Sequence, residues 1–442
     1  MAEIFPFRGL TFNGERVGGH GRVVTQPYDK ITPAMREEYF RRSPFSIARI
    51  ICSAPEGADL AGHFHGVART FRDWLKQGLL TRSRRPCLYP YHQTYKVPGS
   101  GRASTRRSFI GLGRLHDYRE GVVRPHEKTH SGPKLDRLEL TRHSGCQFGQ
   151  LFMLYPDPEQ AVNSALEAAV GGAEPLIEVT DEDGVIHRVW AVEDQSAVAG
   201  VQELMGPKNL YIADGHHRYE TALTYWREQA EAGVPVVGNE AIDRAMMSFV
   251  SIHDQGLSVL PTHRVMFNLD GFSLPGLIKK LSADFDSADL GPATGDSLAR
   301  QLEQMASLRH NLIAAAKGAP SLTSLRLKAS ADPVTRILGP GSAVWKGLEV
   351  NVLHRLVLEE ALGVTAGDLE HQTKVAYLRD PREALRLVLD PGTRYQAAFF
   401  LNPTGVEQVA AVADNGEFMP QKSTDFYPKM LTGLVINQLN LA

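Results

Sequence analysis

The sequence is poor in cysteine and has no long apolar run. Its three cysteines, Cys52, Cys87 and Cys146, lie far apart and form no Cys-x-x-Cys pair, which argues against a disulfide framework and a cysteine-rich zinc site. No uncharged apolar run approaches the roughly 20 residues that cross a bilayer. The first residues also lack the apolar core of a signal peptide. We therefore expect a cytoplasmic protein with no membrane partner.

An excess of charge of either sign is also missing. Lysine and arginine number 48 against 50 aspartate and glutamate residues, which gives a formal net charge of −2. Proteins that bind polyanions usually show a strong basic excess, so we expect no nucleic-acid partner. The expected partner is a small molecule, and the sequence leaves the oligomeric state open.

Length and hydrophobic patterning predict several domains of mixed structure. The 442 residues are 43% hydrophobic, which suits two or three domains of ordinary size. Alternating runs around the loop 98–107 and the pair Asp183–Gly184 predict β-hairpins. Hairpins mixed with helices favour an α+β or mixed α/β fold with mixed sheets. We expect an N-terminal segment 1–83, a central domain 84–289 and a C-terminal region 290–442.

One segment combines the signals of a strand, a sharp turn and a helix. The apolar run Asn209–Ala213 leads into Asp214 and Gly215, and a helical pattern begins at His216 or His217. Asp214 suits a helix N-cap, and Gly215 allows the backbone to turn. The first N–H groups of the helix would then be available to an anion.

The side chains on this turn point to the same chemistry. His216, His217 and Arg218 are consecutive, and three potentially cationic groups beside the positive end of a helix repel one another unless an anion such as phosphate lies among them. The structural alternative is that Arg218 pairs with Glu220 or Asp214. We favour the phosphate-binding turn.

A second constellation lies in RPHEKTHSGPKLDRLEL, residues 124–140. HEKTH matches the HExxH pattern of zinc proteases, but that pattern requires a helix that carries both histidines on one face. Pro125 and the Ser-Gly-Pro at 131–133 break such a helix. We therefore expect a loop that presents Glu127 as a carboxylate base. Other polar candidates nearby are His126, Thr129, Lys134, Asp136 and Arg137.

Two weaker candidates lie further along the chain. Lys422, Ser423 and Thr424 occupy a proline-flanked loop, MPQKST, where lysine beside hydroxyl groups suits phosphate contacts. No GxxxxG precedes them, so this is not a P-loop, and an ordinary surface loop fits equally well. His263, in LPTHRVMF, is a weaker candidate still.

The motifs taken together resemble a known family. The chain carries, in order, QPYDKI, RPHEKTHSGPKLDR, LYIADGHHRYETAL, LPTHRVMF, LEVNVLHRLVLEEALG, FFLNPTGVEQV and MPQKSTDFYPK. This set resembles the family catalogued as domain of unknown function 1015. The order of PHE-x-T and DGHHR is also similar to the free-serine kinases of the ParB/sulfiredoxin-like superfamily.

The second resemblance implies a ParB/sulfiredoxin-like core around DGHHR and a mechanism. In those kinases the glutamate takes the serine hydroxyl proton and the DGHxR turn holds nucleotide phosphates. Carried over, the catalytic residues are Glu127, Asp214 and His217. The nucleotide-binding residues of the turn are Gly215, His216 and Arg218. From the residues themselves we add Lys422, Ser423 and Thr424 as nucleotide-binding candidates and His126, Thr129, Arg137 and His263 as substrate-binding candidates.

The expected activity is an ATP- or ADP-dependent kinase of a small hydroxylated metabolite, with L-serine as the first candidate. Phosphoryl transfer needs charge neutralisation at the phosphates and a base aligned on the acceptor, and Asp214 could hold Mg²⁺. Two alternatives stay open, a phosphatase or nucleotide hydrolase that uses the same turn and a ParB-like nucleotide-binding switch. Although 87 positions separate Glu127 from Asp214 (214 minus 127), the kinase hypothesis requires both to line one cleft.

Overall fold

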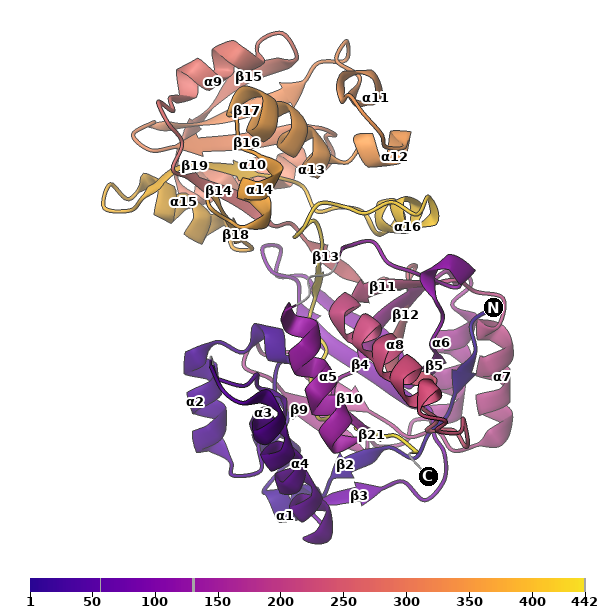
Figure 1. Cartoon of the computed structure of the whole chain (residues 1–442). Helices are drawn as coiled ribbons and strands as arrows, with labels where there is room; N and C mark the ends of the chain where they lie inside the picture. The colour runs from indigo at the N-terminus through magenta and orange to yellow at the C-terminus, as the bar shows by residue number, and fades with distance from the viewer. Residues whose placement is uncertain (56, 129–131, 441–442) are drawn as a thin grey trace. The chain divides into compact units, whose positions relative to one another are not determined.

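The chain packs into two compact units. A computed structural model describes residues 1–55, 57–128 and 132–440. Unit 1 comprises Met1–Ser258 together with Pro428–Ala442, and unit 2 comprises Val259–Tyr427. The yellow C-terminal segment in Figure 1 lies among the elements of unit 1.

These units divide the chain differently from the three predicted segments, 1–83, 84–289 and 290–442. The first segment is part of unit 1, because β2 (Leu10–Phe12) pairs with β3 (Leu80–Arg82) and Leu10 also bridges to Ile436. Long-range pairing of this kind is not visible in local sequence patterns, which explains the difference.

Unit 1 is built on a mixed sheet of nine described strands. Its order is β6-β11-β8-β12-β5-β4-β10-β9, and β1 also pairs with β5. The strands are β1 (Ile4–Phe5), β4 (Tyr89–Lys96), β5 (Ala103–Arg114), β6 (Val123–Arg124), β8 (Leu151–Tyr155), β9 (Ile177–Thr180), β10 (Ile186–Val189), β11 (Leu210–Asp214) and β12 (Arg244–Ser251). Both predicted hairpins are confirmed, since β4 pairs antiparallel with β5 and β9 with β10. The apolar strands pack with flanking helices in one buried cluster.

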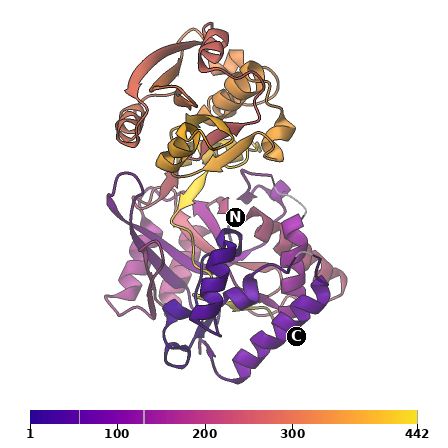
Figure 2. The same cartoon turned by 90° about the vertical axis from the view of Figure 1, so that its left-hand side faces the viewer.

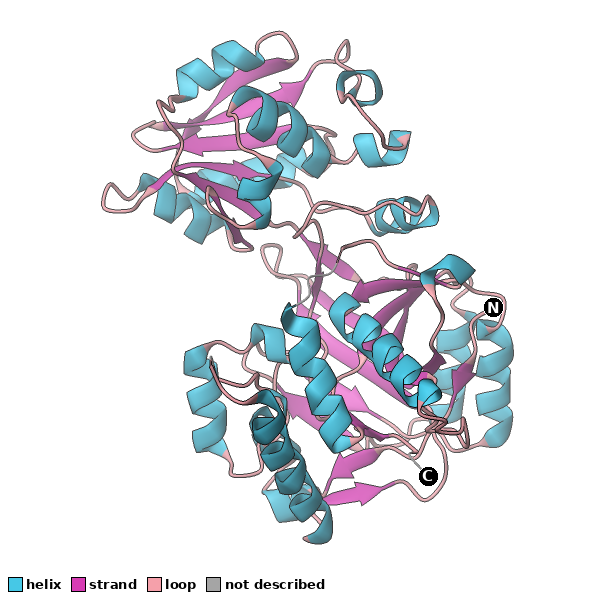
Figure 3. Cartoon of the chain, viewed as in Figure 1, coloured by secondary structure: helices cyan, strands magenta, loops and turns pink. Residues whose placement is uncertain are grey.

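Helices and short strands complete unit 1 (Figures 1 and 3). The helices are α1 (Gly14–Val17), α2 (Pro33–Arg42), α3 (Ala48–Ile51), α4 (Leu60–Lys76), α5 (Gly132–Ser144), α6 (Ala161–Val170), α7 (Gln195–Met205) and α8 (His216–Glu231). Shorter 3-10 turns are η1 (His20–Arg22), η2 (Tyr28–Lys30) and η3 (Tyr118–Glu120). The strands β7 (Cys146–Gln147) and β21 (Asn437–Gln438) pair antiparallel, which fastens the returning C-terminal segment to the unit.

Unit 2 has a separate antiparallel sheet, flanked by helices (Figure 2). Its order is β15-β17-β16-β19-β14-β18. The strands are β14 (His263–Phe267), β15 (Phe285–Pro292), β16 (Asn311–Ala316), β17 (Ser321–Leu327), β18 (Val375–Leu378) and β19 (Tyr395–Phe400). Two short strands, β13 (Ser258–Leu260) and β20 (Asp425–Tyr427), pair with each other. The chain as a whole is therefore a mixed α/β protein with several sheets.

The helices of unit 2 include a π-helix. They are α9 (Leu274–Leu281), α10 (Gly295–Met305), α11 (Pro333–Arg336), α12 (Ala343–Lys346), α13 (Glu349–Val352), α14 (Ala366–Glu370), α15 (Pro381–Leu389) and α16 (Val406–Asp414). A nine-residue π-helix, η4 (Leu353–Ala361), continues α13. Among the described residues, no helix is both long and apolar enough to cross a membrane.

Candidate functional site

Two of the predicted motifs follow neighbouring strands of the unit 1 sheet. Strands β6 and β11 pair in parallel, with Val123 opposite Leu210 and Arg124 opposite Tyr211. Parallel strands end at the same edge of a sheet, and loops beyond those ends are the usual place for ligands in α/β folds. The sheet therefore brings the Pro-His-Glu segment and the DGHHR turn to one edge.

The helices that follow these strands also lie side by side (Figure 1). Lys134 on α5 pairs with Glu220 on α8, and Arg142 Nε donates to Glu228 Oε2 at 3.0 Å. The residue numbers differ by 86 in both pairs. A constant offset means that the two strand–turn–helix segments run parallel and in register.

The two turns touch through a pair of histidines. His126 donates from Nδ1 to the carbonyl of Ile212 at 2.7 Å, and its backbone N–H lies 3.4 Å from His216 Nε2. The two rings are 4.8 Å apart, edge to face. Burial lowers the pKa of His126 to about 4 and, together with His126, holds the pKa of His216 well below its usual range. Both rings are therefore neutral near pH 7.

This result corrects one prediction about the phosphate-binding turn. His216 is 6% exposed, so it is a buried neutral group that orients the turn and not a cation on its surface. His126, predicted to contact substrate, is fully buried as well. Each ring contacts the backbone of the other motif.

Glu127 follows His126 directly and is half-buried. Its backbone is thereby held beside the start of α8, and the requirement that Glu127 and the turn line one cleft stays a prediction. Thr129, predicted to bind substrate, and His130, the second histidine of HEKTH, lie outside the described residues. Helix α5 begins only at Gly132, so His126, Glu127 and Lys128 are not part of a helix. His126 Nδ1 is hydrogen-bonded to the Ile212 carbonyl.

The start of α8 differs in detail from the prediction. Gly215, with φ of +95°, is the N-cap residue, and no side chain caps the helix. A Cβ atom at Gly215 would also lie 2.9–3.0 Å from the guanidinium of Arg218. The positive φ therefore favours glycine here, and any other residue would also have to displace the Arg218 guanidinium. Asp214 is not the N-cap.

Asp214 instead lies at the centre of a cluster of cations. Its Oδ2 accepts from Arg218 Nη2 at 2.8 Å and its Oδ1 from Lys429 Nζ at 3.3 Å. Burial alone would raise the pKa of Asp214, but Lys429, Arg218 and Lys30 together lower it well below the usual range. The carboxylate is therefore ionised at every physiological pH.

Two members of this cluster, Lys30 and Lys429, were not among the predicted site residues. Lys30 belongs to QPYDKI and Lys429 to the DFYPK end of the C-terminal motif. The only sequence signal for these two lysines was that each belongs to a family motif. Neither spacing nor periodicity connects positions 30, 214 and 429. Arg218 is also bound to the carbonyl of Gln150, through Nη1 at 2.6 Å. The predicted alternative, an Arg218–Asp214 pair, is thus present in the structure.

His217, the third predicted member of the turn, occupies the first turn of α8 and is half-buried. Thr221 Oγ1, one turn later, donates to the carbonyl of His217 at 2.8 Å. The position of His217 at the helix start agrees with the predicted arrangement. The catalytic role proposed for His217 stays a prediction.

Four further predicted residues, Lys422, Ser423, Thr424 and His263, belong to unit 2, whereas Arg137 lies on α5 in unit 1. Lys422 has a left-handed backbone with φ of +57°, and its carbonyl accepts from Arg264 Nη2 at 3.3 Å. Ser423 is buried, and its carbonyl accepts from Thr404 Oγ1 at 3.0 Å; Thr424 is half-buried in the same loop. His263 is 1% exposed on β14, and burial lowers its pKa to about 3. We therefore assign His263 to the core of unit 2.

The cluster does not fit a metal ion held by the protein. Both oxygens of Asp214 are bound by cations. Within residues 1–55, 57–128 and 132–440, no group of three or more His, Cys, Asp or Glu side chains could hold a metal. The donor set that Mg²⁺ prefers, carboxylates and water with octahedral geometry, is thus not provided by this turn.

Solved structures offer only distant likenesses. A free serine kinase in complex with AMP is 12% identical, with a TM-score of 0.33, over 69% of this chain and 84% of that chain. SbnI with a C-terminal truncation, from Staphylococcus aureus, is 11% identical, with a TM-score of 0.32, over 75% and 87%. A conserved hypothetical protein from Pyrococcus furiosus is 12% identical, with a TM-score of 0.30, over 69% and 87%. Such low TM-scores carry no argument about function.

The sequence itself gives a clearer assignment. No curated protein matches the chain. A family described as "Protein of unknown function (DUF1015)" matches residues 4–363, most of the sequence. The chain therefore belongs to the DUF1015 family of proteins of unknown function.

Proposed function

We propose that unit 1 transfers a phosphoryl group from ATP or ADP to the hydroxyl of a small metabolite, with L-serine as the first candidate. The observation that carries the proposal is the meeting of two motifs at one sheet edge. The Pro125–Glu127 segment and the Asp214–Arg218 turn follow the parallel strands β6 and β11, and His126 packs on His216. A ParB/sulfiredoxin-like core around this turn is part of the proposal.

The charge at the helix start supports a phosphate ligand. Arg218, Lys429 and Lys30 act together on one carboxylate, Asp214, at the positive end of α8. Backbone N–H groups at a helix N-terminus and neighbouring cations together favour a bound phosphate. The turn thus supplies the charge neutralisation that phosphoryl transfer needs.

Glu127 supplies the second requirement, a group that orients the acceptor. In the proposed step the acceptor hydroxyl oxygen forms a bond to the terminal phosphorus while the bond from that phosphorus to the bridging oxygen breaks. The hydroxyl proton passes to the Glu127 carboxylate and then to solvent. Mg²⁺ would enter as part of the nucleotide substrate, because Asp214 is already paired with two cations.

The test is turnover of the purified full chain with ATP or ADP, Mg²⁺ and a panel of hydroxy amino acids. Glu127→Gln keeps the side-chain shape but removes the proton acceptor. It should lower turnover by roughly 10²–10⁴ while nucleotide affinity stays nearly unchanged. Glu231→Gln is the matched control, since Glu231 is exposed at the last position of α8, and it should behave as wild type.

The outcomes distinguish the candidate activities. Phosphorylation of a single acceptor supports the proposal and names the substrate. Nucleotide hydrolysis without any acceptor would favour the hydrolase alternative, and tight binding without turnover would favour a nucleotide-binding switch. Normal turnover of Glu127→Gln with every acceptor would overturn the role given to Glu127.

A further inference from the structure

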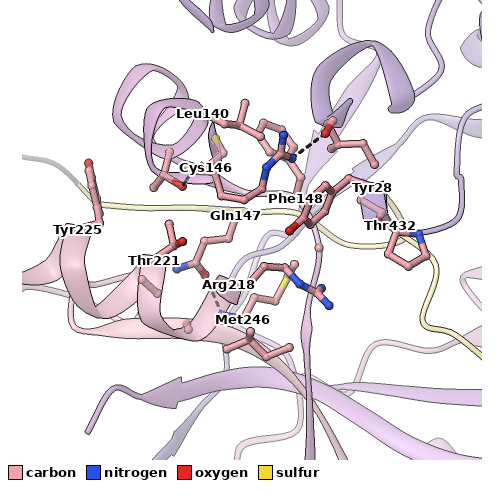
Figure 4. A pocket seen from close by; sticks show the side chains of 18 of the residues that line it. Tyr28, Leu140, Cys146, Gln147, Phe148, Arg218, Thr221, Tyr225, Met246 and Thr432 are labelled. Atoms are coloured by element: carbon pink, nitrogen blue, oxygen red, sulfur yellow. Dashed lines mark hydrogen bonds between the residues drawn. The ribbon is translucent and has the colours of Figure 1, made fainter. Parts of the chain in front are cut away.

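A second feature of unit 1 is a cavity of about 80 Å³ beside helices α5 and α8 (Figure 4). Its polar lining includes Tyr28, Arg137, Arg218 and Thr432, and the described residues that line it include two arginines and no acidic side chain. Figure 4 shows Arg218 beside this space, with Tyr28 and Thr432 on the same side of it. The cavity is therefore electrostatically unsuited to a cation.

Both arginines are fixed in place and retain donors. Arg137 is 6% exposed. It donates from Nη1 to the carbonyl of Ile51 at 2.6 Å, and from Nε and Nη2 to Asp136. Three of its five N–H groups are thus used, and Arg218 uses two of its five. A planar guanidinium that is already oriented loses little freedom when it binds a carboxylate.

Two hydroxyl groups in the cavity have unused hydrogen-bonding capacity. Neither the Tyr28 hydroxyl nor the Thr432 hydroxyl has a hydrogen-bond partner among the described residues. The ring of Tyr28 lies under the guanidinium of Arg137, 4.2 Å from ring centre to Cζ. Burial raises the pKa of Tyr28, although Arg218 and Arg137 oppose the rise. The phenol is therefore a neutral donor near pH 7.

The rest of the cavity is apolar and small. Its apolar lining includes Leu140, Phe148, Leu151, Ala222, Ala245 and Met246. About 10–15 Å³ of such volume holds one water-sized group, so 80 Å³ accommodates roughly five to eight non-hydrogen atoms. An aliphatic body of that size would bury its apolar surface here, and a bare phosphate would not.

We infer that this cavity binds a small aliphatic carboxylate, whose oxygens meet the guanidinium groups of Arg137 and Arg218 and the hydroxyl of Tyr28. The inference is independent of phosphoryl transfer, because it concerns binding without nucleotide. Arg218 also contacts Asp214, so occupancy of the cavity is linked to the anion-binding turn. Thermodynamic linkage makes any such effect reciprocal.

The experiment uses the full chain, without nucleotide, and butyrate as the probe. Isothermal titration calorimetry should show saturable binding of butyrate, at least tenfold weaker binding of the neutral isostere butyramide, and none of butylamine. Tyr28→Phe should weaken butyrate binding about tenfold, which corresponds to ~1.4 kcal/mol for one lost hydrogen bond to a charged group. Its melting temperature should not fall, since the hydroxyl it removes has no partner.

A matched control separates the site from general effects. Tyr118→Phe removes a buried hydroxyl that has no hydrogen-bond partner within the described part of the chain. Tyr118 is not among the described residues that line the cavity, so butyrate affinity should not change. Ala222→Leu should fill the cavity and abolish binding. If that variant does not fold, Gly149→Ala replaces it, because its Cβ would lie 3.2 Å from Thr432 Oγ1 and 3.5 Å from Arg218 Nη1.

Three results would overturn the inference. They are equal affinity for butyrate and butyramide, butyrate binding that survives both Tyr28→Phe and the cavity-filling variant, and no saturable binding at millimolar butyrate. None of these results bears on the phosphotransferase proposal, which is tested by turnover of Glu127→Gln.

Discussion

Replacement of Asp214 by asparagine tests the charge cluster most directly. Asp214→Asn keeps the size of the side chain but removes the negative charge that Arg218, Lys429 and Lys30 share. The variant should be less stable than wild type in dilute buffer. It should also bind phosphate or pyrophosphate more tightly, because the cations lose their internal counterion.

The expected loss follows from the two contacts at 2.8 and 3.3 Å. Hydrogen bonds to charged groups contribute about 1.5–3 kcal/mol each, and breaking a fully buried ion pair costs about 3–5 kcal/mol. Here the side chains of Asp214, Arg218 and Lys429 keep 25%, 17% and 11% of their exposure. Asparagine also retains one acceptor oxygen. We therefore expect a loss of about 2–3 kcal/mol.

The assay is equilibrium unfolding in urea, followed by tryptophan fluorescence. Three of the four tryptophans, Trp74, Trp190 and Trp226, belong to unit 1. The control Asp73→Asn removes an exposed carboxylate 3.9 Å from Lys76 and should cost less than about 1 kcal/mol. Pyrophosphate at a hundred times its Kd should restore about 2.7 kcal/mol to Asp214→Asn.

Two results would refute this reasoning. If Asp214→Asn unfolds at the same urea concentration as Asp73→Asn, the cations do not depend on Asp214. If pyrophosphate stabilises wild type and Asp214→Asn equally, the anion binds elsewhere on the chain.

Two buried groups, one in each unit, should contribute to stability with opposite pH dependence. Burial lowers the pKa of His126 to about 4, below the unfolded value near 6.5, so the unfolded chain binds the proton first. Unit 1 should then lose up to about 1.4 kcal/mol per pH unit as pH falls from about 6.5 to about 4, and His126→Gln should reduce the slope of its urea midpoint against pH. Burial raises the pKa of Glu349, in unit 2, to about 7, above the unfolded value near 4.3. The contribution of Glu349 to the stability of unit 2 should therefore be lost as pH rises from about 4.5 to about 7, opposite in sign to the contributions of the buried His263 and His354. Glu349→Gln should remove the Glu349 contribution in the same assay.

Local signals were sufficient to predict the turn but not its surroundings. The apolar run before Asp214, the glycine and the helical pattern after it are all local, and the structure confirms β11 and α8 there. Strand β6 was not predicted, because it has two residues, Val123 and Arg124, and is defined only by pairing with β11. The contact between the two motifs depends on that pairing.

Charge and burial were harder to predict, because both depend on residues distant in sequence. His216 resembles a cation when its neighbours are read along the chain, whereas in the fold it is enclosed against His126. Lys429 lies 215 positions from Asp214 and reaches it only because the chain leaves unit 1 for unit 2 and then returns. A discontinuous unit of this kind produces no break in composition, which also explains why the predicted segment boundaries differ from the units.

The chain on either side of Glu127 is aligned by regular structure. The residue numbers of three contacting pairs differ by 86: His126–Ile212, Lys134–Glu220 and Arg142–Glu228. The first segment is therefore aligned with the second in the same way before and after the loop that contains Glu127. Sites supported by paired strands and packed helices are more sharply positioned than sites on loops alone. Conservative replacement of Glu127 should therefore leave this alignment intact, and a change in turnover would then report on chemistry and not on folding.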